Sequence, residues 1–275
     1  MASEFVHLHN HSDYSLLDGA QTVQTLVNTI DDLGMDSVAL TEHGNMFSVI
    51  PYYKAAKKAG IKPIIGCETY VAVGSRFEKK PRADGGWGNN HLVLLAQNYK
   101  GYQNLMKLVT FGYLDGFYYR PRVDIDLLKE HNEGIICLSG CLKGEVTEKM
   151  LKDDWDGAKE AALRFAEIFE NRFYLEVQNH GIPDEAQNIQ NMKKLAGELN
   201  LPLVCTNDAH YAKHEHWEAH DVHICLGTGK DRDDPNRLRY ATPEFYFKTQ
   251  DQMYEMFKDV PNAIENTRKI ADSID

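Results

Sequence analysis

The feature that most constrains the fold of this chain is an alternation of short apolar runs with longer segments of helical period. Runs rich in Val, Ile and Leu, bounded by Gly, Pro, Asn or Asp, alternate with segments whose apolar residues recur every three to four positions. Such alternation is typical of βα units that assemble around a parallel sheet. A chain of 275 residues is long enough to close these units into one β/α barrel. We predict seven strands, at residues 5–9, 37–41, 63–70, 92–96, 134–139, 173–178 and 203–206.

The segments between the predicted strands carry the signals of helices and loops. Residues 22–33 and 52–59 are each followed by a glycine, which readily adopts the left-handed backbone that ends a helix. Residues 155–169 have a strongly amphipathic pattern, as expected of a helix that packs on a sheet. Residues 76–90 are polar and lack any periodicity, so they predict a mobile loop.

The pattern changes after His210. A histidine-rich stretch, a charged loop and two predicted helices, at residues 250–257 and 261–273, follow it. We therefore interpret residues 211–275 as a connecting segment with helices that lead to a following domain. Residues 1–275 are expected to form one domain of a longer polypeptide, because the chain stops within a helical pattern that has no cap.

Charge, cysteine content and hydropathy limit the class of protein. A formal net charge of -11 argues against a free-standing nucleic-acid binder, because duplex affinity comes largely from Lys and Arg that neutralise phosphates. If DNA is the substrate, other parts of a larger protein must help to hold it. The five cysteines are odd in number and lie mostly in apolar runs, which favours a reducing cytoplasm. There is no signal peptide and no apolar run of membrane-spanning length, so we expect a cytoplasmic protein without membrane contact.

Residues that commonly bind metals gather where the predicted strands end. His7, His9 and His11 repeat at every second position, so on an extended strand they would share one face, about 7 Å apart, and could ligate neighbouring ions. The C-terminal ends of parallel strands converge on one face of a barrel, which would bring distant residues together there. His91 fits this pattern less well because it begins its strand. The other ligand-type residues at these positions are Glu42, His43, Cys67, Glu68, His91, Cys141, Asp208 and His210.

Taken singly, several of these residues have simpler explanations. Glu68 could be a partly buried ion-pair partner, and Cys141 could be a small core residue. Asp18 is equally consistent with a turn or with a cap before the helix that follows. It is their coincidence at strand ends that favours a metal site.

Four segments resemble the polymerase and histidinol phosphatase (PHP) family. They are FVHLHNHS at residues 5–12, YSLLDG at 14–19, TEHG at 41–44 and NDAH at 207–210. Three more are similar to the N-terminal PHP domain of bacterial DNA polymerase III alpha subunits, which are replicative polymerases of the C family. These are GFYYRPR at residues 116–122, LSGC at 138–141 and EFYFK at 244–248.

The resemblance implies a fold and a ligand set. The fold is a distorted (β/α)7 barrel, similar to a TIM barrel, with nine ligands around three divalent metal ions at the C-terminal ends of the strands. Among the ligands, His11, Glu68, Asp208 and His210 are expected to be catalytic. His7 stands where many PHP sequences have Asp, so we assign it, with Glu42, to the orientation of ligands, with direct ligation by His7 as a lesser alternative. The nine ligands implied are His9, His11, Asp18, His43, Glu68, His91, Cys141, Asp208 and His210.

The resemblance also implies an activity. Most of the ligand atoms are nitrogen or sulfur, which favours zinc, with manganese or iron as alternatives. We expect a hydrolase for phosphodiesters, namely a 3′–5′ proofreading exonuclease in DNA replication that acts on a single-stranded 3′ end. It would work within a DNA-directed DNA polymerase whose later domains perform nucleotidyl transfer. Its partners would be those domains, the replication clamp and other holoenzyme subunits. The alternatives are a catalytically silent, metal-stabilised scaffold for the polymerase domain and a stand-alone small-molecule phosphatase.

Two further groups of residues carry weaker signals. Tyr118, Tyr119, Arg120 and Arg122, with the loop of Lys79, Lys80, Pro81 and Arg82, combine cations with aromatic rings and could contact DNA. The alternative is that the rings pack the loop on the barrel and the lysines are simply solvated. We interpret the histidines of the later segment as structural, and His180 follows the sixth strand near the expected metal face. These later histidines are His214, His216, His220 and His223.

Overall fold

The structure, a computed structural model, describes residues 4–81 and 88–275. Its described residues form a seven-stranded sheet in the order β1-β2-β3-β5-β6-β7, and the short strand β4 pairs with β2 outside this order. Six of the strands coincide with predicted ones, whereas β4 is not predicted by the sequence. The strands are β1 (Ser37–Leu40), β2 (Lys62–Ala72), β3 (Asn89–Ala96), β4 (Arg122–Val123), β5 (Ile135–Leu138), β6 (Phe173–Val177) and β7 (Leu203–Cys205).

The predicted first strand, residues 5–9, closes the ring of strands without forming a continuous strand itself. A parallel bridge pairs His7 with Val38 of β1, and a second one pairs Asn10 with Ala209, just beyond β7. The extended segment therefore lies between the two ends of the sheet. Together with the sheet it makes a distorted α/β barrel, as predicted.

The strand β3 runs antiparallel to both of its neighbours, β2 and β5, so the prediction of a parallel repeat is wrong at this strand. A parallel connection needs a crossover of a dozen or more residues, usually a helix. The described residues between β2 and β3, at 73–81 and 88, contain no helix. As a consequence, the beginning of β3, with His91, lies at the same end of the barrel as the C-terminal ends of the parallel strands.

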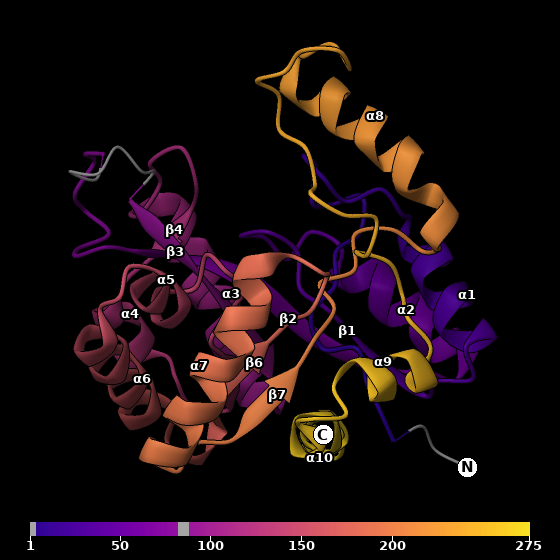
Figure 1. The fold of residues 1–275 in the computed structure, drawn as a ribbon. Helices are drawn as coiled ribbons and strands as arrows, with labels where there is room; N and C mark the ends of the chain where they lie inside the picture. Colours follow the sequence, from indigo (N-terminus) through magenta and orange to yellow (C-terminus); the bar gives the residue numbers. More distant parts are fainter. Residues whose placement is uncertain (1–3, 82–87) are drawn as a thin grey trace.

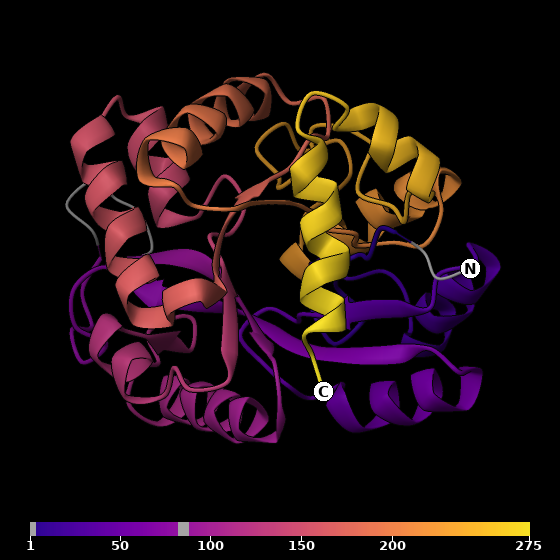
Figure 2. The same cartoon turned by 90° about the horizontal axis from the view of Figure 1, so that it is seen from below.

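Helices surround the sheet (Figures 1 and 2). The predicted helix at residues 22–33 is confirmed, and the Thr22 hydroxyl caps it by accepting a hydrogen bond from the amide of Thr25 at 3.1 Å. The helices are α1 (Val23–Asp32), α2 (Val49–Ala59), α3 (Tyr99–Leu114), α4 (Ile125–Glu130), α5 (Glu145–Leu151), α6 (Trp155–Phe169), α7 (Pro183–Leu199), α8 (Trp217–Thr228), α9 (Gln250–Met256) and α10 (Pro261–Asp272). No described helix is both long and apolar enough to span a membrane.

The inside of the barrel is filled by a separate apolar cluster. Successive side chains of a strand point to opposite faces, so Val93 and Leu95 of β3 fill the interior and His91 faces the same way, one step nearer to the upper mouth. Ile64 and Glu68 have the same relation in β2. The interior therefore continues directly into the residues predicted to ligate metal. The apolar cluster consists of Val6, Leu8, Ala39, Ile64, Val93, Leu95, Ile136, Leu138, Val204, Ile270, Ala271 and Ile274.

Ile270 and Ala271 of this cluster come from α10, and Ile274 follows that helix. The helix α10 lies across the lower mouth of the barrel (Figure 2). Thr267 accepts a hydrogen bond from the amide of Val6 at 3.0 Å, and Asn266 donates one to the carbonyl of Leu203 at 2.8 Å. The helix α8, in contrast, projects beyond the upper end of the barrel (Figure 1). The segment after residue 210 thus contributes to both ends of the barrel.

Part of the loop predicted at residues 76–90 cannot be compared with the structure, because residues 82–87 lie outside the described part. The loop ends at Asn89, where β3 begins.

Candidate metal centre

The structure brings all nine residues of the predicted ligand set to the upper mouth of the barrel. Glu68 lies at their centre. One of its oxygens, Oε1, is 3.6 Å from Nε2 of His9 and 2.6 Å from Nδ1 of His91. The other, Oε2, is 3.6 Å from Nε2 of His11 and 2.5 Å from Nδ1 of His43. A single carboxylate from β2 therefore joins four imidazoles from three other parts of the chain.

Two aspartates connect the remaining ligands to this group. Asp208 Oδ1 lies 3.0 Å from Nε2 of His11 and 3.4 Å from Nε2 of His9. Asp18 Oδ1 lies 3.2 Å from Nε2 of His43, and its Oδ2 lies 3.9 Å from Nε2 of His210. Asp18, for which a turn or cap role was equally consistent with the sequence, is thus part of the cluster.

Cys141 approaches the cluster from the loop after β5. Its Sγ lies 3.9 Å from Oε1 of Glu68 and 3.8 Å from Nδ1 of His91. Gly140 permits this approach, because its φ of +85° is left-handed and a Cβ there would lie 2.6 Å from the carbonyl oxygen of His91. The Cys141 loop can therefore pass close to the beginning of β3.

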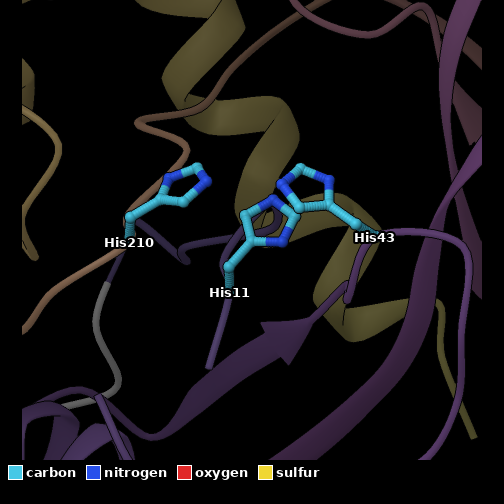
Figure 3. A group of neighbouring side chains, drawn as sticks. All are labelled: His11, His43 and His210. Atoms are coloured by element: carbon cyan, nitrogen blue, oxygen red, sulfur yellow. The ribbon is translucent and has the colours of Figure 1, made fainter. Parts of the chain in front are cut away.

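Ligand atoms in this cluster form three overlapping groups of a size that suits metal ions. Within each group they all lie within 4.8 Å of one another. In the first group the three imidazoles face one another (Figure 3), and the rings of His43 and His210 stack on that of His11 at 4.0 and 4.4 Å. The groups are His11, His43 and His210; His9, His11 and Asp208; and His43, Glu68 and His91.

Orphaned polar atoms show that the cluster fits metal ions. Among the described residues, seven of the nine candidates each have one buried nitrogen or oxygen without a hydrogen-bond partner. Burying a polar atom without a well-aligned partner costs about 1–3 kcal/mol. Some of these atoms lie only 2.5–3.4 Å from one another, but none of them makes a well-aligned hydrogen bond, so their number at one place favours a ligand. Around a tetrahedral zinc with bonds of about 2.0–2.1 Å, ligand atoms would lie roughly 3.3 Å apart, close to several distances above. The atoms are His9 Nε2, His11 Nε2, Asp18 Oδ1, His43 Nδ1, Glu68 Oε2, Asp208 Oδ1 and His210 Nε2.

Without metal, the cluster is held together by protons. Burial disfavours the charged forms, yet neighbouring carboxylates, first Asp208, hold the pKa of His9 well above its usual value. Conversely, burial would raise the pKa of Glu68, but the imidazoles around it, first His91, hold that pKa well below its ordinary value. The pKa of His11 falls to about 3, because it is buried and faces His43 and His210. Burial and nearby carboxylates raise the pKa of the Cys141 thiol.

A further carboxylate, outside the nine candidate ligands, supports this cluster, and it was not identified from the sequence. Glu176, in the buried strand β6, has its Oε1 2.7 Å from Nδ1 of His9, which leaves Nε2 of that ring free to face the centre. Its other oxygen accepts a hydrogen bond from the amide of Gly140 at 3.0 Å, so it links β6 to the Cys141 loop. The available signal was a glutamate in the middle of an otherwise apolar strand, because a carboxylate is rarely buried without a partner.

We predict that Glu176→Gln lowers metal affinity by about 10- to 100-fold, because the glutamate orients the His9 ring and raises its basicity. The measurement is competition for zinc against a chromogenic chelator, with Glu198→Gln at the surface as the control. Affinity equal to that of the wild type would contradict the assignment.

Glu42 is connected to His11, a candidate ligand, through a serine. Its Oε2 accepts a hydrogen bond from Ser15 Oγ at 2.6 Å, and Ser15 Oγ lies 3.0 Å from Nδ1 of His11. Ser12 also donates to this carboxylate from its amide, at 3.1 Å.

His7, in contrast, does not orient the ligands. Its Nε2 bonds to the carbonyl of Lys248 at 2.9 Å, and its ring packs edge-on against Phe5 and Phe247. The reason lies in the backbone, because the chain bends at residue 9 and the alternation of faces that would align His7 with His9 and His11 is broken.

The segment expected only to connect domains forms one wall of the centre. Tyr240 donates a hydrogen bond from its hydroxyl to Oδ2 of Asp18 at 3.3 Å, and its ring lies 5.2 Å from that of His210. Nε2 of His220 bonds to the carbonyl of Asp18 at 2.8 Å. Arg237 anchors this segment through two hydrogen bonds, of 2.6 and 2.7 Å, to Asp221 of α8.

Two other histidines singled out in the sequence, His180 and His214, have structural contacts. His180 is buried, with its Nδ1 2.6 Å from Glu185 and its Nε2 2.8 Å from the carbonyl of Asn207, just before Asp208. It therefore lies next to the metal face as a packing residue. His214 is half exposed and lies 3.8 Å from Glu244.

Of the residues expected to contact DNA, Arg122 is buried and cannot do so. Only 2% of Arg122 is exposed. Its guanidinium lies 5.2 Å from the centroid of the Tyr118 ring. It also donates hydrogen bonds to the backbone carbonyls of Gly116, Arg76 and Glu78, at 2.9, 3.1 and 2.8 Å. In the sequence, a cation beside aromatic residues looks the same whether it packs inside the protein or lies at the surface.

The other described members of this group lie at least partly at the surface. Arg120 and Tyr119 are exposed, and Tyr118 is half buried. Lys79 and Lys80 are exposed at the surface, whereas Arg82 lies outside the described residues.

We predict that Arg122→Met lowers the free energy of unfolding by about 3 kcal/mol, because it leaves one buried and two partly buried carbonyls without their charged donor. Arg120→Met, two positions away and exposed, is the matched control and should change the free energy of unfolding by less than about 0.5 kcal/mol. Urea denaturation of the two variants measures both values, and equal stabilities would contradict the structural role of Arg122.

Comparison with known proteins gives a consistent family match. The PHP domain family model matches residues 7–180. DNA polymerase III subunit alpha of Borreliella burgdorferi is 48% identical over 99% of this chain and 24% of that protein. The same subunit of Treponema pallidum is 46% identical over 97% of this chain and 23% of its own length, and that of Thermus aquaticus is 41% identical over 98% and 22%. The chain thus spans about a quarter of the length of the curated relatives it matches.

Comparison with solved structures gives a distant similarity to a further protein. The structure, from Bifidobacterium adolescentis, belongs to a protein provisionally assigned as a metal-dependent phosphoesterase; it is 12% identical, with a TM-score of 0.45, over 92% of this chain and 95% of the other. A similarity this distant supports no functional conclusion.

Proposed function

This chain belongs to the PHP domain family, and from that premise we propose that its metal centre hydrolyses phosphodiesters by removing nucleotides from the 3′ end of single-stranded DNA. The observation that carries the proposal is the convergence of seven buried ligand atoms without hydrogen-bond partners at one mouth of the barrel. Buried polar atoms of this kind are the signature of a ligand site, and their mixture of imidazoles and carboxylates suits divalent metals. The nine residues would hold three ions, zinc first, with manganese or iron as alternatives.

The charge of such a centre favours an anionic substrate. Three divalent ions bring about six positive charges, and the four anionic ligands would be the carboxylates of Asp18, Glu68 and Asp208 and the thiolate of Cys141. About two positive charges would therefore remain to attract a phosphodiester. Bound ions of this kind would supply a water nucleophile of lowered pKa and neutralise charge on the phosphate.

The side chains around the centre favour water over a protein nucleophile. Ser12 and Ser15 both donate their hydroxyl protons to Glu42, so they are committed to holding His11 in place. The Cys141 thiol has a raised pKa, which makes it a poor nucleophile in the absence of metal. The chain's own residues therefore position ligands and substrate, and Tyr240, with its hydroxyl on Asp18, steadies the side of the centre that faces α8.

The context we propose is a replicative polymerase. Relatives that match this chain over almost its whole length are alpha subunits of DNA polymerase III, and they are about four times as long. The remaining polymerase domains, the replication clamp and other subunits would then deliver the DNA that a chain of net charge -11 does not attract by itself. Tyr119 and Arg120, exposed beside the centre, are the contacts we propose for DNA within this chain.

The test combines metal analysis with a nuclease assay on the purified chain. Elemental analysis should give about three metals per chain, and single-stranded DNA labelled at its 5′ end should shorten stepwise when zinc or manganese is supplied. Bound metal with intact DNA would favour the scaffold function over hydrolysis. Cleavage of small phosphomonoesters in preference to DNA would favour a phosphatase, and an absence of bound metal would overturn the ligand assignment itself.

A further inference from the structure

Three aromatic side chains form an exposed row at the surface near the metal centre. Phe47 is 60% exposed, Tyr113 38% and Phe117 50%. The centroid of the Tyr113 ring lies 6.1 Å from that of Phe47 and 6.3 Å from that of Phe117, and the ring planes differ by 39° and 23°. We call these three residues the aromatic row. Large aromatic rings exposed side by side on a protein surface mark a binding site more often than isolated ones do.

The row is tied to the metal centre at one end by the loop that carries His43. The amide of Phe47 donates a hydrogen bond to Oδ1 of Asn45 at 3.0 Å, and Nδ2 of Asn45 donates one to the carbonyl of His43 at 3.1 Å. Phe47 is therefore held by the same short turn that presents a candidate ligand.

The other two rings come from the end of α3 and the turn after it, and Pro121 joins them to that loop. A Cβ placed on Gly44, next to His43, would lie 2.8 Å from Cγ of Pro121. A Cβ placed on Gly112, next to Tyr113, would lie 3.5 Å from the carbonyl carbon of the same proline. The absence of a side chain at Gly44 lets the His43 loop pack against Pro121, and the end of α3 lies at ordinary contact distance from the same proline.

Arg120, next to Pro121 in the chain, places a positive charge close to the metal centre. The guanidinium of Arg120 lies 5.7 Å from the centroid of the Tyr70 ring. The Tyr70 ring in turn lies 5.2 Å from that of His91 and 6.4 Å from that of His43. Arg120 is exposed, and it has no ion-pair partner among the described residues, so its charge is available to a ligand.

We propose that the aromatic row binds the bases of single-stranded DNA while Arg120 holds a phosphate on the way to the metal centre. Every base has a π-face, and stacking on an aromatic side chain contributes about 1–3 kcal/mol per base. Base faces are hidden in a duplex, so such a row selects single strands. This inference rests on the proposed function for the fate of the bound strand, and it adds the surface that would hold the strand. It also gives a chain of net charge -11 a source of DNA affinity that does not depend on a basic patch.

The experiment measures binding separately from cleavage. Fluorescence anisotropy of a 5′-labelled oligonucleotide is recorded with protein that carries Glu68→Gln, so that no strand is shortened during the titration. Phe47→Ala, Tyr113→Ala and Phe117→Ala are added singly and together. Each is expected to raise the Kd for single-stranded DNA by about tenfold, as the loss of one stacked base predicts. Phe47→Trp and Phe117→Tyr should restore affinity, which a merely structural role would not require.

The matched control is Tyr99→Ala. Tyr99 is 73% exposed on the same helix, and fourteen residues at 1.5 Å per residue place it about 21 Å from Tyr113. Its substitution should leave the Kd unchanged. A base analogue whose fluorescence is quenched by stacking, such as 2-aminopurine, should be quenched by the parent protein and less by the alanine variants.

The outcomes separate this inference from the proposed function. If the alanine variants bind DNA more weakly but the wild type cleaves none, the role of the aromatic row is supported and the hydrolytic function is contradicted. If the wild type shortens DNA and the alanine variants bind as tightly as their parent, the row is overturned and the function stands. An absence of single-strand binding by the parent protein also overturns the row, and would indicate a surface that another part of a longer protein covers.

Discussion

Glu68→Gln is expected to abolish phosphodiester hydrolysis, with a loss of at least about 1,000-fold, and to reduce the metal content of the purified protein. The physical reason is that both oxygens of Glu68 face the cluster, and each approaches two imidazoles. Glutamine has nearly the same shape but only one oxygen and no charge, so the ions that share this carboxylate would lose a negative ligand. A 1,000-fold loss corresponds to about 4 kcal/mol of transition-state stabilisation, within the range for a ligand at the reacting centre.

The appropriate control is another buried glutamate that pairs with a histidine. Glu185 is 3% exposed, and its Oε1 lies 2.6 Å from Nδ1 of His180, outside the ligand set. Glu185→Gln should lower stability but retain the metals. Elemental analysis and the 5′-label assay distinguish the two variants. Glu68→Gln protein with full metal content and activity would contradict the central position of Glu68 in the site.

The convergence of the candidate ligands could be expected from sequence because short motifs at strand ends carry them. His9, His11 and Asp208 each fall within a few residues of a recognisable apolar strand. Parallel strands deliver such residues to one face whatever the details of the fold. Asp18 is different, because a turn residue before a helix has a second explanation, and only the resemblance to a known family separated the two.

The features of the fold and site that could not be predicted from the sequence are those determined by tertiary contacts. Strand direction is not encoded in periodicity, so the antiparallel course of β3, which explains why His91 begins its strand, had to be seen. Arg122 and Arg120 belong to the same motif, but packing buries one and exposes the other. Likewise Tyr240 reaches Asp18 across more than 200 residues, through a loop whose composition indicates only a solvated connection.

Removal of the metals by a chelator is expected to lower the melting temperature by about 15 °C or more. An ion present at 100 times its Kd stabilises the folded state by about 2.7 kcal/mol, so three such ions contribute about 8 kcal/mol. For a chain of this size, each kcal/mol corresponds to roughly 2 °C or more. Differential scanning calorimetry with and without chelator measures the change, and zinc added in excess of the chelator should restore the original value.

The pH dependence of the difference in melting temperature between metal-loaded and chelated protein tests whether the ions bind at the histidine cluster. In the metal-free protein the pKa values of His9 and His43 are raised, so their contribution to stability is complete below their unfolded pKa of about 6.5 and is lost as pH rises through the folded values. Metal-bound imidazoles carry no such proton, and protons compete with metal at low pH. The gap in melting temperature between loaded and chelated protein should therefore widen from pH 6 to pH 8. A difference in melting temperature that stays constant with pH would place the stabilising ions away from these histidines. A widening difference without hydrolysis at either pH would indicate a metal centre that stabilises the barrel and has no catalytic activity.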